Sequence, residues 1–194
     1  MRAVPTILLM AMLVLAGCKP STPAAPATAP ATGEPKPAAE APAADAGNGM
    51  QIRETTAEIP TLAVDTVDGG RFDLSAQRGK WVVVNFWATW CAPCLKEMPE
   101  LSALDAMRED VQVIGLAYED ITPADMQAFL KEHPVVYPIA IIDVMTPPAD
   151  FATPRGLPTT YLISPDGKVA KAFAGPVTAH DLETLMAQSP GKAG

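Results

Sequence analysis

The hydrophobic positions in residues 55–190 fall into short runs of the kinds that predict strands and helices. Three runs are almost wholly apolar, which is typical of strands buried on both faces. Two pairs of shorter runs are each joined by a turn sequence with Asp and Gly, which predicts two β-hairpins. The predicted buried strands are Trp81–Trp87, Val111–Ala117 and Ile139–Ile142, and the predicted hairpins join Ile59–Val64 to Arg71–Leu74 and Leu157–Ser164 to Lys168–Phe173.

Three of the intervening segments predict helices. In Cys94–Met107 the apolar residues recur at helical spacing, and Pro99 is expected to kink this helix. Pro123–His133 predicts a second helix with Thr122 as its N-terminal cap, and a closing helix is expected from Thr178 to about Gln188. The alternation of strands and helices predicts an α/β fold with a mixed sheet.

The first residues of the chain read as a secretory signal. Arg2 supplies a positive charge, and the apolar segment Ile7–Ala16 is too short to span a membrane. Leu15-Ala16-Gly17-Cys18 resembles the bacterial lipobox, so residues 1–17 are predicted to be a lipoprotein signal peptide and Cys18 the lipidated first residue. An ordinary signal peptide that contains a cysteine is the alternative. Lys19 stands where an aspartate usually retains lipoproteins in the inner membrane, which favours the outer membrane.

Composition divides the rest of the chain into a tether, one domain and a tail. Of the 32 residues from Lys19 to Met50, 18 are Ala or Pro, and such a segment cannot bury enough apolar surface to fold. Residues 18–54 are therefore predicted to be a lipidated, flexible tether with a contour of about 100 Å at about 3.1 Å per residue. Residues 55–190 have the length of one domain, and residues 191–194 form a tail.

The formal net charge of −8 argues against a nucleic-acid partner. Nearly all of this charge lies in the predicted domain, where it favours solubility. We expect a monomer.

The segment Trp90-Cys91-Ala92-Pro93-Cys94 carries the clearest chemistry, because it places two thiols one helical turn apart after a predicted strand. A helix that begins here places Cys91 at its N-terminus, where free N–H groups and the helix dipole favour a negative sulfur. Cys91 is the expected attacking thiolate, and Cys94 is the expected resolving thiol of a mixed disulfide. The pair itself is expected to be a redox-active disulfide, and no other cofactor is expected.

Two other interpretations of the cysteine pair are open. A zinc half-site needs two further ligands at metal-binding spacing, and His133 and His180 do not provide them. No metal is therefore expected. The other interpretation is an inert structural disulfide.

Several motifs together resemble the thioredoxin superfamily, and within it the TlpA/ResA type of envelope thiol-disulfide oxidoreductase. They are the segment Val84–Cys94, the proline at position 99, and Gly156-Leu157-Pro158-Thr159-Thr160 leading into a Pro165-Asp166-Gly167 turn. The resemblance implies a thioredoxin-like fold, a mixed central sheet flanked by helices, with an N-terminal β-hairpin and an inserted helix-strand element. It also implies a cis Leu157-Pro158 peptide against the dithiol. The implied substrate-binding residues are Trp90, Ala92, Pro93, Leu157 and Pro158.

The resemblance also bears on proton transfer. Classical thioredoxin has a buried acid in the strand before its dithiol, whereas this chain has Asn85, which cannot take up a proton. In the TlpA/ResA type an acid at the end of the next strand lies near the pair, and Glu119 matches that position. Glu119 is therefore a candidate catalytic residue. The alternative is a solvated loop carboxylate beside Asp120.

The favoured function is a reductase anchored in the bacterial cell envelope by lipid, with its domain facing the periplasm. Its clients would be proteins with disulfides, for example apocytochrome c, and a membrane thiol-electron donor would supply electrons. One alternative is a peroxiredoxin-like peroxide reductase, although Thr89 does not provide the Thr/Ser-x-x-Cys spacing which that chemistry requires. A non-catalytic thiol or metal-binding chaperone is the other.

Overall fold

A computed structural model describes residues 52–189, which belong to one compact unit of the chain. The predicted signal peptide, Cys18, most of the tether and the tail 191–194 lie outside the described residues.

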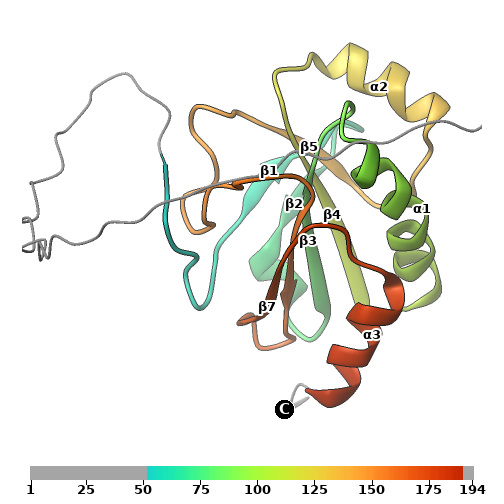
Figure 1. Ribbon diagram of the computed structural model, residues 1–194. Coiled ribbons are helices and arrows are strands. Elements are labelled where there is room, and N and C mark those ends of the chain that lie inside the picture. Colours follow the sequence, from blue (N-terminus) through green and yellow to red (C-terminus); the bar gives the residue numbers. More distant parts are fainter. Residues whose placement is uncertain (1–51, 190–194) are drawn as a thin grey trace, which may run out of the picture. The chain divides into compact units, whose positions relative to one another are not determined.

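A five-stranded sheet forms the centre of the domain, in the order β5-β4-β3-β6-β7 (Figure 1). β3 pairs in parallel with β4 and antiparallel with β6, so the sheet is mixed. β3 and β5 begin and end where the apolar runs predict, because a strand buried on both faces carries apolar side chains at nearly every position. The strands are β3 (Trp81–Trp87), β4 (Val111–Tyr118), β5 (Ile139–Ile142), β6 (Thr159–Ile163) and β7 (Val169–Ala174).

The N-terminal hairpin forms a separate two-stranded antiparallel sheet, followed by a short 3-10 helix. Its first strand begins at Ala63, four residues later than predicted from Ile59. Pro60 lies in the part of the predicted strand that does not form one, and it has no N–H to donate to a hydrogen-bond ladder between strands. Gly69 has a φ of +85° in the turn, a conformation that favours glycine. The elements are β1 (Ala63–Asp65), β2 (Arg71–Asp73) and the 3-10 helix Leu74–Gln77.

Three helices follow the predicted segments closely within the described part of the chain. α1 (Ala92–Met107) begins two residues before the predicted start, with Cys91 as its N-cap, and continues through Pro99. α2 (Pro123–Glu132) and α3 (Ala179–Gln188) have the predicted threonine caps, each of which accepts a hydrogen bond from an N–H in the first turn.

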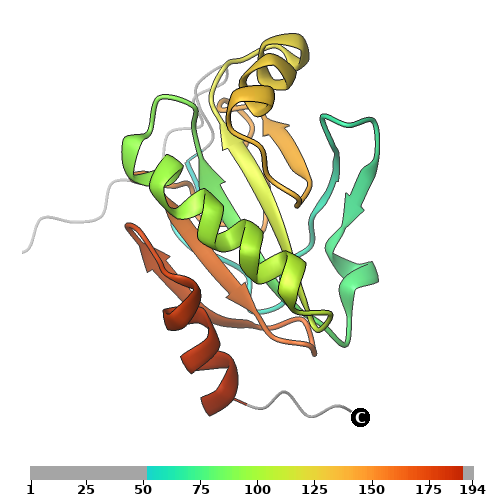
Figure 2. The ribbon, with the colours of Figure 1, turned by 90° about the vertical axis from the view of Figure 1, so that its right-hand side faces the viewer.

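The alternation of side chains along β3 builds two different cores. Val83 and Trp87 belong to a cluster with buried residues of α1, α2 and α3, and Figure 2 shows α1 and α3 in front of the sheet. Val84 and Phe86 point the other way, into a cluster with the N-terminal hairpin. Asn85 is on the helix side of the sheet, where it meets α1.

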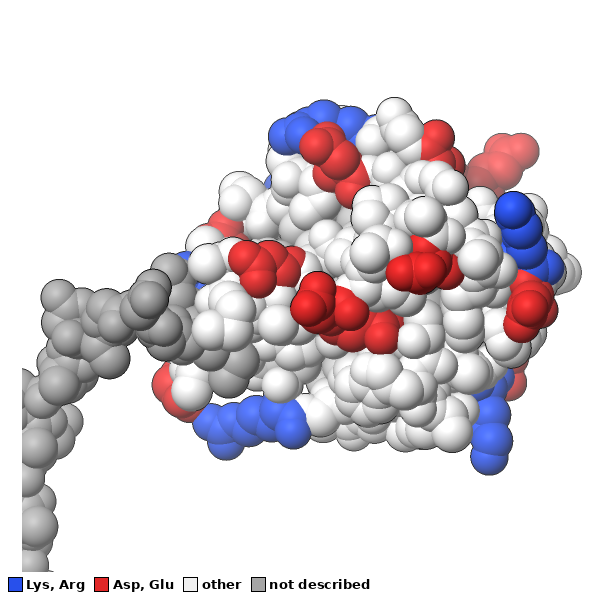
Figure 3. Space-filling view, turned by 90° about the horizontal axis from the view of Figure 1, so that it is seen from above, with Lys and Arg blue, Asp and Glu red and all other residues white. Residues whose placement is uncertain are grey.

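The surface of the domain carries more acidic than basic side chains on the face shown in Figure 3. Asp and Glu side chains lie across the middle of this face, and Lys and Arg side chains lie mostly at its rim.

Candidate active site

The cysteine pair lies at the junction between β3 and α1. The chain turns after β3, where the N–H of Cys91 donates to the carbonyl of Ala88 at 3.1 Å. Cys91 and Cys94 form a disulfide, with a Cα–Cα distance of 5.3 Å. The predicted pairing of the two thiols is thus present in the structure.

The two sulfurs differ in their surroundings. Cys91 Sγ accepts a hydrogen bond from the N–H of Cys94 at 3.3 Å and caps the N-terminus of α1. Cys94 is fully buried, whereas Cys91 is 4% exposed. The N–H of Cys94 and the N-terminus of α1 both stabilise a negative charge on the Cys91 sulfur. The arrangement suits Cys91 as nucleophile and Cys94 as resolving thiol.

The surface around Cys91 is formed by the residues next to it in sequence. Ala92 and Pro93 are exposed in the first turn of α1, and the Trp90 side chain is 70% exposed. An exposed tryptophan beside a reactive sulfur offers a large apolar contact to another protein.

The Leu157-Pro158 peptide is cis, as the resemblance implies. The peptide directly precedes β6, whose Thr159 pairs with Phe86 of β3, so it lies at the end of β3 where the cysteine loop begins. Leu157 packs against the apolar cluster that contains both cysteines. This second segment, far away in sequence, therefore packs against the same apolar cluster as the disulfide.

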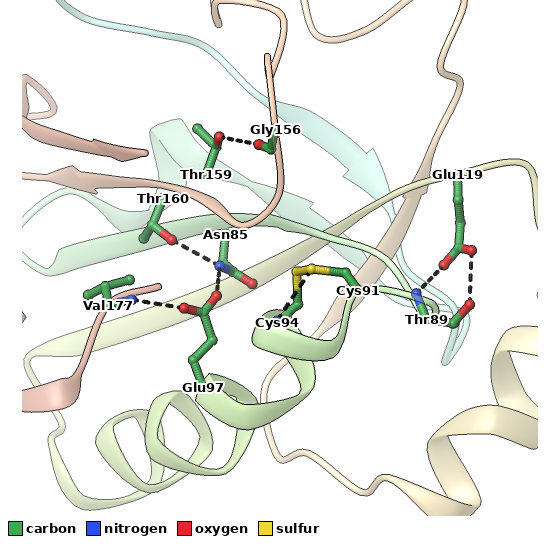
Figure 4. Close-up of a disulfide and its surroundings, with 10 residues drawn as sticks. All are labelled: Asn85, Thr89, Cys91, Cys94, Glu97, Glu119, Gly156, Thr159, Thr160 and Val177. Carbon is green, nitrogen blue, oxygen red and sulfur yellow. Dashed lines mark hydrogen bonds between the residues drawn. A yellow bond between two sulfur atoms is a disulfide. The ribbon is translucent and has the colours of Figure 1, made fainter. Parts of the chain in front are cut away.

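Glu119 follows β4 and is half-buried. Its Oε1 accepts a hydrogen bond from the N–H of Thr89 at 2.6 Å, and its Oε2 accepts one from the Thr89 hydroxyl at 2.9 Å. The carboxylate thus holds the loop that leads to Cys91 (Figure 4). Its predicted part in proton transfer stays a prediction, and the hydrogen bonds add a role in positioning.

The sequence interpretation missed Glu97, which is a buried acid behind the disulfide. Its side chain is only 4% exposed. Oε1 accepts a hydrogen bond from Asn85 Nδ2 at 2.8 Å, and Oε2 accepts one from the N–H of Val177 at 3.0 Å (Figure 4). Burial raises the pKa of the Glu97 carboxyl, although the bonds from Val177 and Asn85 oppose the rise.

Two sequence signals could have pointed to Glu97. Glu97 is three residues after Cys94, so the two side chains lie on the same face of α1. Asn85 is a polar residue inside an apolar strand, and a buried amide requires a partner. The sequence alone could not name that partner, because α1 contains three carboxylates, those of Glu97, Glu100 and Asp105.

The described residues contain no group of three or more His, Cys, Asp and Glu side chains that could hold a metal ion. His133 stacks on Phe129, with ring centroids 4.4 Å apart.

A family model described as Redoxin matches residues 48–187 of the chain. The chain therefore belongs to the redoxin family. Among curated proteins, this redoxin is 35% identical over 139 residues to the thiol-disulfide oxidoreductase ResA of Bacillus cereus, which covers 71% of this chain and 78% of that protein. It is 32% identical over 140 residues to ResA of Bacillus subtilis, with 70% and 76% coverage.

Solved structures show the same fold. A thioredoxin family thiol:disulfide interchange protein from Chlorobium tepidum matches with a TM-score of 0.56 and 25% identity, over 73% of this chain and 99% of that one. A secreted disulfide oxidoreductase of Mycobacterium tuberculosis matches with a TM-score of 0.55 and 25% identity, over 66% and 95%. The redoxin has a thioredoxin-like fold and is a thiol-disulfide oxidoreductase.

Proposed function

We propose that this redoxin is a disulfide reductase of the bacterial cell envelope. The observation that carries the proposal is the buried carboxylate of Glu97 behind Cys94. A negative charge there disfavours thiolates, and a less stable thiolate makes the reduced pair a better reductant. Ala92 and Pro93 add neither charge nor a side-chain donor between the cysteines.

In the proposed reaction Cys91 acts first. Its thiolate attacks one sulfur of a client disulfide, which forms a mixed disulfide and releases one client thiolate. Cys94 then loses its proton to Glu97 and attacks Cys91 Sγ. The second client thiolate leaves, so the client gains two electrons and the Cys91–Cys94 pair is oxidised to the disulfide.

The client segment would bind across the exposed residues at the sulfurs. Trp90, Ala92 and Pro93 lie next to Cys91 in sequence, and all three are exposed. Leu157 and Pro158, which form the cis peptide before β6, would border the pair from the other side. These two segments would hold an extended chain while the sulfurs exchange. Apocytochrome c before haem attachment is one such client.

The supply of electrons and the location form part of the same proposal. A membrane thiol-electron donor would reduce the disulfide after each turnover. Lipid on Cys18 would hold the chain at the membrane, with the domain in the periplasm. Within residues 52–189, none of the helices has both the length and the apolar character to cross a bilayer.

The assignment of Glu97 is tested by a matched pair of variants, Glu97→Gln and Glu119→Gln. Glu97 must be ionised to accept the proton of Cys94, so the rate of client reduction should fall as the pH drops through its raised pKa. Glu97→Gln should lower the rate at neutral pH by about 100-fold. It should also remove the fall of the rate at low pH, which is the acid limb of the pH–rate profile. Glu119→Gln should slow the reaction and keep the limb. If the limb disappears only in Glu119→Gln, Glu119 is the base instead.

The direction of electron flow is tested by equilibrating the chain with glutathione buffers. We expect a reduction potential nearer to about −270 mV than to about −120 mV. A value above about −180 mV would favour an oxidase or isomerase. A Cys94→Ser variant should trap the client as a mixed disulfide, and rapid consumption of peroxide by the wild-type chain would support the peroxide reductase alternative.

A further inference from the structure

Asn85 is fully buried in the middle of β3, and only the nitrogen of its side-chain amide makes hydrogen bonds among the described residues. Nδ2 donates to Glu97 Oε1 at 2.8 Å and to Thr160 Oγ1 at 2.9 Å. Within the described part of the chain, Oδ1 has no hydrogen-bond partner. A buried carbonyl oxygen without a donor destabilises the state in which it occurs.

The free oxygen of Asn85 faces the disulfide. Cys94 and Glu97 lie one turn apart on the buried face of α1, and Asn85 already contacts Glu97. Figure 4 shows Oδ1 pointing away from Glu97 and toward the Cys94 end of the disulfide. In the disulfide, Cys94 Sγ carries no proton, so it has nothing to donate to this oxygen.

Reduction supplies the missing donor. A donor dithiol is oxidised to a disulfide, and its two electrons and two protons pass to the Cys91–Cys94 pair. The S–S bond breaks, and Cys94 gains an S–H group on the side toward which Asn85 Oδ1 points (Figure 4).

We propose that Asn85 is a positioning residue whose Oδ1 accepts the S–H of reduced Cys94 while its Nδ2 holds Glu97. This inference rests on the proposed dithiol chemistry and assigns a role to a residue that cannot itself take up a proton. The hydrogen bond keeps Cys94 a thiol while Cys91 reacts, and it keeps that thiol next to the carboxylate that accepts its proton. It also favours the dithiol over the disulfide, since only the dithiol satisfies Oδ1.

The hydrogen bond is measured directly from the S–H stretching band of the reduced full-length chain. Hydrogen bonding weakens the S–H bond, so the Cys94 band should lie below the frequency of a free thiol. Loss of the band in Cys94→Ser identifies it. Asn85→Leu should move the band to the free-thiol frequency, and Thr160→Val should leave it in place because this control removes only a partner of Nδ2.

The equilibrium with glutathione separates Oδ1 from Nδ2. Asn85→Leu should lower the equilibrium constant for reduction of the Cys91–Cys94 pair about tenfold, which corresponds to about 30 mV. The same decrease should occur in a Glu97→Gln background, where Nδ2 no longer holds a carboxylate. If Asn85→Leu has no effect in that background, Asn85 acts only through Glu97 and the proposal is wrong.

These results are independent of client reduction. A Cys94 band at the free-thiol frequency in an active reductase overturns the role of Asn85 and leaves the proposed function intact. A shifted band in a chain that reduces no client disulfide supports the role of Asn85 and overturns the proposed function. Should Asn85→Leu fail to fold, the wild-type and Cys94→Ser bands still show whether the Cys94 thiol donates a hydrogen bond, and a free-thiol frequency overturns the proposal.

Discussion

The two cysteines are three residues apart, yet their environments give them different tasks. Cys91 caps α1 and accepts an N–H bond, whereas Cys94 is fully enclosed. We therefore expect an alkylating reagent below neutral pH to label Cys91 first in the reduced chain. Mass spectrometry after brief labelling checks this, with Cys94→Ser as the control that retains the fast site. Faster labelling of Cys94 would reverse the two roles.

Glu97 should make stability depend on pH in the acid range. Its pKa is higher in the folded state than in the unfolded chain, so the folded protein holds this proton more tightly. The resulting stabilisation is complete below the unfolded pKa of about 4.3 and is lost as the pH rises through the folded-state pKa. The loss amounts to about 1.4 kcal/mol for every unit between the two pKa values.

Denaturant titrations at a series of pH values measure this effect. Glu97→Gln should flatten the fall in the free energy of unfolding above about pH 4. Glu132→Gln is the matched control, because Glu132 is an exposed glutamate at the end of α2 and its loss should keep the fall. Equal slopes in the wild type and Glu97→Gln would contradict the burial of this acid.

At the scale of elements, the start of α3 is coupled to the site although α3 has no catalytic residue. Thr178 caps this helix in a capping box with Asp181, and the preceding residue, Val177, donates its N–H to Glu97. Thr122 caps α2 in a similar way, and within residues 52–189 no hydrogen bond joins Ile121, the residue before this cap, to Glu97.

The two caps give a matched pair of substitutions. Thr178→Ala and Thr122→Ala should each lower the free energy of unfolding by about 1 kcal/mol, because each removes an acceptor for an N–H of the first turn. Only Thr178→Ala should also shift the acid limb of the rate of client reduction, since it loosens the segment that carries Val177. Equal shifts in both variants would show that the limb follows overall stability.

At the scale of the whole molecule, the mature chain should begin at Cys18 and fractionate with membranes. A diacylglycerol together with a further acyl chain anchors stably, whereas one chain alone is marginal. Cys18→Ser should move the protein to the soluble envelope fraction and leave reduction of a soluble disulfide unchanged. Recovery of unaltered protein in the soluble fraction, with an unmodified Cys18 by mass, would show that the lipobox interpretation is wrong.

The sequence by itself determined the local features of the domain. The bounds of β3 and β5 follow from apolar runs, and the caps of α2 and α3 follow from threonines at the helix starts. The dithiol is equally local, because one helical turn brings Cys91 and Cys94 together. Each of these features depends on residues within a few positions of one another.

Only the tertiary structure showed that Glu97 is buried and which groups the acids Glu97 and Glu119 contact. The bond between Val177 and Glu97 joins positions 80 residues apart, and that between Thr89 and Glu119 joins positions 30 residues apart. Periodicity cannot tell which glutamate of a helix is buried, because that depends on what packs against it. Here a strand amide at Asn85 and the segment before α3 enclose Glu97, so the fold converts an ordinary helix residue into a buried acid.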